Sequence, residues 1–110
     1  MDELPIVCDR GTLASSEPTR QRELWASLLA DVEERRELEE GYALKLPAAR
    51  LRDAAELMGI ERRCCGFLKL RLDAEASEPH IWFTLSGPPG SKRVLDAELE
   101  LMLDSSQRSP

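Results

Sequence analysis

The stretch FLKLRLDAEASEPHIWFTLS, residues 67–86, decides the fold expected for this chain. Apolar and polar residues alternate in both of its halves, which is typical of strands with one buried and one solvated face. The connection ASEP, residues 76–79, is short enough to make the two halves neighbours. The stretch therefore predicts an antiparallel hairpin. Its buried side chains would be Leu68, Leu70, Leu72, Ile81, Phe83 and Leu85.

Helical patterns lie on both sides of this hairpin. Residues 15–36 place apolar side chains at helical spacing after two serines that can cap a helix, and residues 47–65 do so after a proline. The expected buried stripe of the second helix includes Leu51, Ala54, Ala55, Leu57 and Met58. A third helical pattern follows the GPPG turn, over residues 91–103.

Two further segments complete the predicted sheet. Residues 37–47 indicate a short strand, a turn with Gly41 at positive φ, and a second strand; alternatively, the preceding helix continues to Leu38. The apolar run Leu4–Cys8 predicts one more strand. The order β-α-β-β-α-β-β-α predicts an α+β fold of two layers, with a mainly antiparallel sheet of four or five strands and three helices on one face.

Length and charge restrict the classes of function. The 110 residues suit a single domain, expected over residues 1–104, with residues 105–110 as a mobile polar tail. The net charge of −6 argues against a nucleic-acid partner. The acidic N-terminus does not match a secretory signal, and no apolar run approaches the roughly 18 residues of a membrane span. We therefore expect a cytoplasmic protein without a membrane contact, whose cysteines stay thiols.

Two adjacent cysteines, Cys64 and Cys65, mark the point where the second predicted helix gives way to the hairpin. Neighbouring residues point about 100° apart on a helix and to opposite faces of a strand, so vicinal thiols converge only where the backbone turns. Gly66 follows at once and permits such a turn. Cys8 ends the first predicted strand. We expect it near the pair, close enough to share an ion or to form a reversible disulfide.

Three thiols without a histidine or acidic cluster suit a soft ion of low coordination number rather than zinc, which takes four ligands. Arsenite, mercury(II) and copper(I) are the ions expected at Cys8, Cys64 and Cys65, and no other cofactor is expected. Thiol redox chemistry at the same residues stays open. The alternative is a non-catalytic interaction or homodimerising module whose cysteines fill the core, because cysteine is among the most buried residue types.

An enzymatic function also stays open. Glu61 lies one helical turn before the cysteine pair and is the candidate catalytic base, although the residues favour an ordinary exposed salt bridge with Arg62 or Arg63 over that role. His80, the single histidine, is expected at the exposed start of a strand. Trp82 on the outward face of the hairpin offers a surface for a homodimer, and stacking on the side chains of Lys69 and Arg71 within one chain is an equal alternative.

Several segments resemble a small bacterial family of about this length. They are IVCD near the start, GYALKLP midway, ERRCCGF and LSGPPGSK. Family members show G-Y-x-h-x-h-P, E-x-x-C-C-x-F and T-G-P-x-G-x-K segments, where h is hydrophobic. The resemblance spans roughly residues 6–99 and concerns a family without an established function. It implies that one recurring segment contains Glu61, Cys64, Cys65 and Phe67, with Cys8 beside it.

The chain departs from this family pattern at two positions. Gly66 stands where proline is familiar, and Ser86 stands where threonine is familiar. Both residues keep the local chemistry, because glycine preserves a turn and serine preserves a hydroxyl group. The departures therefore leave the expected cysteine site intact.

Overall fold

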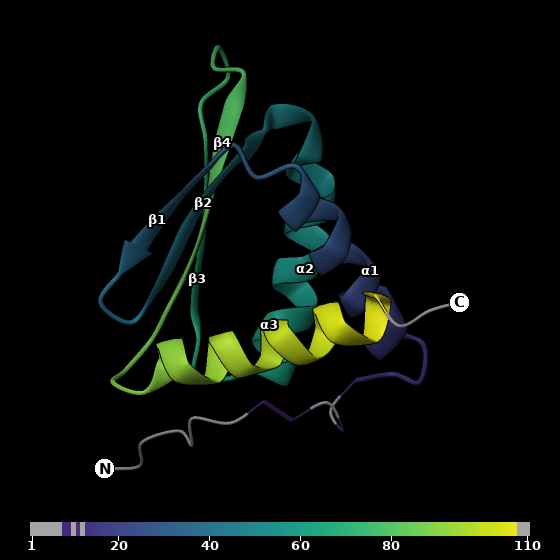
Figure 1. Ribbon diagram of the computed structural model, residues 1–110. Coiled ribbons are helices and arrows are strands. Elements are labelled where there is room, and N and C mark those ends of the chain that lie inside the picture. The colour runs from purple at the N-terminus through teal and green to yellow at the C-terminus, as the bar shows by residue number, and fades with distance from the viewer. Residues whose placement is uncertain (1–7, 10, 12, 108–110) are drawn as a thin grey trace.

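The computed structural model describes residues 8, 9, 11 and 13–107. A four-stranded antiparallel sheet in the order β1-β2-β4-β3 forms one layer, which Figure 1 shows nearly edge-on with helices beside it. The strands are β1 Glu34–Leu38, β2 Gly41–Pro47, β3 Lys69–Ala74 and β4 His80–Ser86. The predicted α+β class with a mainly antiparallel sheet is confirmed.

The hairpin predicted from residues 67–86 forms β3 and β4. Leu70 pairs with Leu85, and Leu72 pairs with Phe83, so the alternating apolar side chains of both strands face the same layer. β4 also pairs with β2 on its other side, which makes it a central strand. Its buried side chains therefore lie at the middle of the core.

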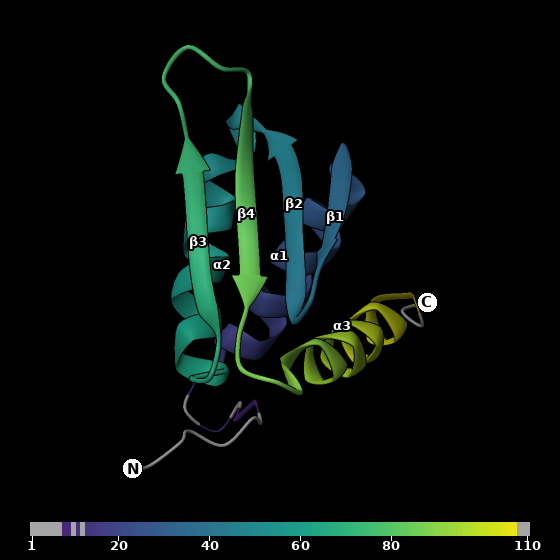
Figure 2. The same cartoon turned by 90° about the vertical axis from the view of Figure 1, so that its left-hand side faces the viewer.

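Two helices cover one face of the sheet, and a third does not. α1 Glu17–Ala30 and α2 Leu51–Cys64 lie behind the sheet, α2 following a short 3-10 turn at Ala48–Arg50 (Figure 2). α3 Ser91–Gln107 instead crosses the end of the sheet and packs against α1 and β2. The expected arrangement of three helices on one face is therefore not confirmed. α3 also extends beyond its predicted end at residue 103.

The first helix is shorter than predicted. It ends at Ala30, and the charged residues expected at its end form β1 instead. β1 is an edge strand paired with β2 from Glu34 opposite Lys45. Its arginines alternate between the two faces of the sheet. The guanidinium of Arg35 lies 4.6 Å from the centre of the Tyr42 ring, and that of Arg36 lies 4.3 Å from the centre of the Trp82 ring.

The role predicted for Gly41 is wrong. Gly41 begins β2 rather than occupying a turn, and among the glycines that the structure describes only Gly90 has a positive φ. A Cβ atom at Gly41 would lie 1.9 Å from the carbonyl oxygen of Leu85. This position therefore requires glycine because β2 and the end of β4 approach closely there.

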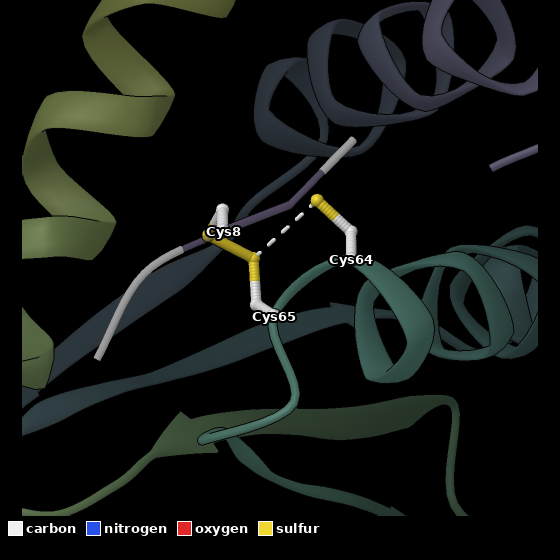
Figure 3. A group of neighbouring side chains, drawn as sticks. All are labelled: Cys8, Cys64 and Cys65. Carbon is white, nitrogen blue, oxygen red and sulfur yellow. Dashed lines mark hydrogen bonds between the residues drawn. A yellow bond between two sulfur atoms is a disulfide. The ribbon is translucent and has the colours of Figure 1, made fainter. Parts of the chain in front are cut away.

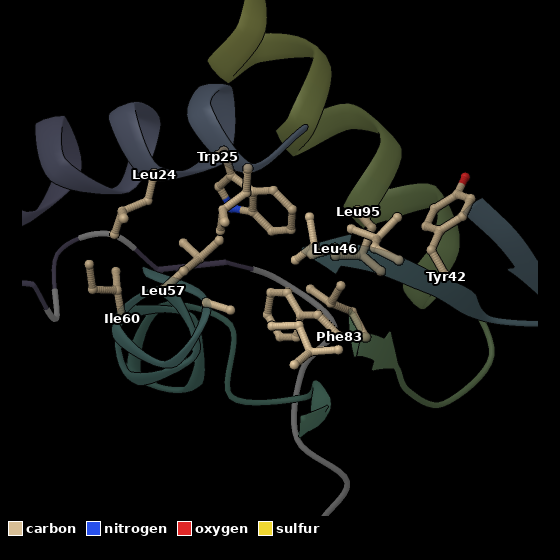
Figure 4. Close-up of a cluster of buried hydrophobic side chains, with 13 residues drawn as sticks. Leu24, Trp25, Tyr42, Leu46, Leu57, Ile60, Phe83 and Leu95 are labelled. Carbon is tan, nitrogen blue, oxygen red and sulfur yellow. The ribbon is translucent and has the colours of Figure 1, made fainter. Parts of the chain in front are cut away.

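The main core lies between the sheet and the helices (Figure 4). The ring centres of Trp25 and Phe83 lie 6.3 Å apart, with the ring planes 21° from parallel, a separation that is common for aromatic pairs. The buried face of α2 differs from the predicted stripe, because Leu51 and Ala55 are exposed. Its buried residues are Ala54, Leu57, Ile60, Glu61 and Cys64.

The structure describes only part of the first predicted strand and of the predicted tail. Residues 4–7 of the strand and residues 108–110 of the tail lie outside the described residues. Both the strand and the domain limit at residue 104 therefore stay predictions.

Two leucines on α2 provide a matched test of this packing. Leu57 is fully buried, whereas Leu51 is 40% exposed. We expect Leu57→Ala to lower the free energy of unfolding by about 2–5 kcal/mol, because it leaves a cavity in the core. Leu51→Ala should change it by no more than about 0.5 kcal/mol. Urea unfolding measures both, and equal losses would contradict the packing described.

Candidate functional site

Three cysteines meet at the C-terminal end of α2 (Figure 3). The sulfurs of Cys8, Cys64 and Cys65 all lie within 4.8 Å of one another. The backbone N–H of Asp9 donates to the carbonyl oxygen of Cys64 at 2.6 Å, so residues 8 and 9 lie against the end of the helix. The predicted proximity of Cys8 to the pair is confirmed. The contact is made with a helix end, rather than between the two strands from which it was predicted.

Cys8 and Cys65 form a disulfide, with Cα atoms 4.3 Å apart. The expectation that all three cysteines stay thiols is therefore wrong for this structure. Cys64 takes no part in the disulfide, and its sulfur lies 3.7 Å from that of Cys65. In this sulfur pair only Cys64 carries an S–H, because the Cys65 sulfur is already bonded to Cys8.

The backbone turn after α2 brings the two adjacent sulfurs to the same side. The N–H of Cys65 closes the last helical turn on the carbonyl of Glu61 at 2.7 Å. The N–H of Leu68 then donates to the carbonyl of Cys65 at 3.0 Å, which turns the chain toward β3. Gly66 lies within this turn without a positive φ. The turn was predicted, but the backbone conformation that would require glycine was not found.

Burial differs among the three cysteines. Cys64 and Cys65 are 1% and 2% exposed and form a small apolar cluster with Phe67. Cys8 is half-buried and packs against this cluster. A molecule arriving from solution would therefore meet Cys8 first. This burial also agrees with the alternative prediction of an interaction module whose cysteines fill the core.

Glu61 is buried beside this cluster, so the prediction of an exposed salt-bridge partner is wrong. Its Oε1 accepts hydrogen bonds from Nε1 of Trp25 at 2.6 Å and from Nε2 of Gln21 at 2.9 Å. Glu61, Cys8 and Cys65 also line a small cavity of about 10 Å³, which is roughly the space of one water molecule. The candidate base thus lies at the disulfide, held by two residues of α1.

The sequence contained a signal for this partner set. Gln21 precedes Trp25 by four residues and falls on the apolar stripe of its helix, where a polar side chain needs a buried partner. The arginine next to the cysteines is engaged elsewhere. Arg63 forms a bidentate pair with Glu17 of α1, and this hydrogen bonding lowers the pKa of Glu17.

His80 does not join the cysteine site. It begins β4, whereas the segment after Cys65 leads to Lys69, which pairs with the last residue of that strand. β4 has seven residues, so His80 at its start lies about 20 Å from Ser86 at its end, which is the end nearer the cysteines. His80 contacts Glu33 at 2.7 Å instead and lines a separate hollow of about 310 Å³ on the outer face. That hollow contains none of the three cysteines.

Comparison with protein-family models, with curated proteins and with solved structures finds no match for this chain. The resemblance drawn from the sequence motifs stays a prediction. Within the part of the chain that the structure describes, no helix has both the length and the apolar character needed to cross a membrane.

The buried carboxylate can be tested against an exposed one on the same helix. Glu61→Ala should lower the free energy of unfolding by about 1–3 kcal/mol, because the indole N–H of Trp25 loses its acceptor in the core. Glu56→Ala serves as the control, since it removes only an exposed pair with Arg20 and should have little effect. Urea unfolding followed by tryptophan fluorescence measures both variants. Equal stability losses would contradict the buried network.

Proposed function

We propose that this chain is a thiol redox protein that cycles between the Cys8–Cys65 disulfide and a dithiol. The observation that carries the proposal is a third sulfur, that of Cys64, which lies within 4.8 Å of both sulfurs of the Cys8–Cys65 disulfide. A disulfide that only holds a fold together needs no third cysteine at its side. Thiol–disulfide exchange, by contrast, proceeds by attack of a thiolate on a disulfide sulfur, and it is favoured where such a group lies close.

Burial gives the reaction a direction. Cys65 is almost fully buried, so the half-buried Cys8 is the sulfur that an external dithiol would attack. One thiolate of the dithiol bonds to Cys8, the Cys8–Cys65 bond breaks, and its electron pair leaves on Cys65. The second thiolate of the dithiol then displaces Cys8 and closes the external disulfide. Two electrons and two protons have passed to the chain.

Reversible reduction tests this function. We expect mild treatment with dithiothreitol to raise the thiol count from one to three per chain under native conditions, and removal of the reductant with oxidised glutathione to restore one. Cys8→Ser should abolish the cycle, whereas the matched variant Cys64→Ser should retain it. Circular dichroism confirms that each variant is folded. A Cys8–Cys65 bond that dithiothreitol reduces only after denaturation would contradict the proposal and support cysteines that serve as core filler.

Binding of a soft metal or metalloid ion by the reduced form is a second candidate function. It is favoured by the convergence of three sulfurs within 4.8 Å. Arsenite, mercury(II) and copper(I) accept a small number of thiolate ligands, and three sulfurs at this spacing offer such a set. Cys8, Cys64 and Cys65 would be the ligands. Oxidation would remove the site, because the disulfide consumes two of its three donors.

Titration of the reduced protein tests the second candidate. One equivalent of arsenite should consume three thiols per chain, and mercury(II) and copper(I) should also bind, whereas zinc(II) should bind weakly for lack of a fourth ligand. Cys64→Ser separates the two functions, because it removes a ligand without removing the disulfide pair. A thiol count that arsenite leaves unchanged would exclude this candidate.

Location and partners are part of the same proposal. In the cytoplasm that the sequence predicts, disulfides are usually transient and catalytic or redox-sensing, so a reversible bond suits that compartment better than a permanent one. The partner of the redox reaction would then be a dithiol or disulfide of the cell. Two further expectations stay predictions. One is that the chain has no nucleic-acid partner, and the other is that it forms a homodimer through the outer face of the sheet.

A further inference from the structure

We infer that Cys64 exchanges with Cys65 as the partner of Cys8, so that the oxidised chain interconverts between a Cys8–Cys65 and a Cys8–Cys64 disulfide. This inference rests on the proposed redox function and adds an internal exchange step to it. Its basis is the position of three sulfurs within 4.8 Å, one of which belongs to a cysteine outside the disulfide (Figure 3).

The backbone selects which sulfur Cys64 would attack. Attack on Cys65 would join two adjacent residues, whose Cα atoms lie about 3.8 Å apart, closer than the 4.3 Å of the observed disulfide and well below the usual separation of about 5.5–6 Å. Attack on Cys8 meets no such restriction. The hydrogen bond from the N–H of Asp9 to the carbonyl of Cys64 already holds the segment of Cys8 beside Cys64. Cys8 is therefore the common partner of both isomers.

The exchange is balanced within the chain. Cys64 gives up its proton, and its sulfur forms a bond to the sulfur of Cys8. The Cys8–Cys65 bond breaks, and its electron pair leaves on the sulfur of Cys65, which takes up a proton. Each isomer holds one disulfide and one thiol, so the step needs neither an oxidant nor a reductant. Cys8 stays bonded to a cysteine at the end of α2 in both isomers.

Three single variants test which pairs can form. After reduction and mild oxidation, Cys65→Ser should lose two thiols through a Cys8–Cys64 bond, and Cys64→Ser should lose two through the observed bond. Cys8→Ser should keep both thiols, since only the adjacent pair remains. Cys65→Ser that stays reduced while folded, as judged by circular dichroism, would overturn the inference. A wild-type disulfide that cannot be cycled would instead overturn the proposed function.

Labelling of the wild-type chain tests whether the exchange occurs. The oxidised protein is quenched with acid, unfolded and alkylated, and then digested with trypsin. Peptides 1–10 and 64–69 carry the three cysteines, and fragmentation between residues 64 and 65 locates the label. Exchange predicts label on both Cys64 and Cys65. Label confined to Cys64 after repeated reduction and reoxidation would overturn the inference. Cys64→Ser is the control, because its Cys65 should remain in the disulfide and carry no label.

Discussion

The buried carboxylate of Glu61 is the constraint that connects the rest of the structure. A carboxylate in the core is costly unless hydrogen bonds satisfy it, and Gln21 and Trp25, which both donate to Glu61, belong to α1. The pair of helices is therefore fixed in its relative position at the end where α2 stops. Cys64 and Cys65 lie at that same end, so the helix contact and the position of the sulfurs share one origin.

The sequence predicted the hairpin well and the edge strand poorly, for a physical reason. β3 and β4 bury one face, so apolar and polar side chains alternate along them, and this alternation identifies both segments as strands. β1 is exposed along four of its five residues, and a solvated helix end has the same composition. Only its pairing with β2, a contact between distant backbone groups, decides between them. The packing of α3 across the sheet end likewise depends on contacts that no local pattern contains.

The candidate site shows a similar division. The vicinal cysteines and the turn after them follow from neighbouring residues, and the proximity of Cys8 was predicted. A reversible disulfide was among the expectations, but the pairing of Cys8 with Cys65 was not predicted, since it depends on the contact of residues 57 positions apart. The burial of Glu61 was also missed, because the charge pattern around it suggested an exposed helix face. Its helical phase with Cys64 and Leu57, both buried, gives the correct side.

The disulfide also divides the chain into two parts. It closes a covalent loop that contains α1, β1, β2 and α2, while β3, β4 and α3 lie outside it. In the chain-entropy model, closing a loop of this length stabilises the fold by about 4 kcal/mol. Reduction would restore the conformational entropy that the closed loop removes from the unfolded chain, so the reduced protein would unfold far more often. Redox state would then set how long the protein survives proteolysis, apart from any reaction at the sulfurs.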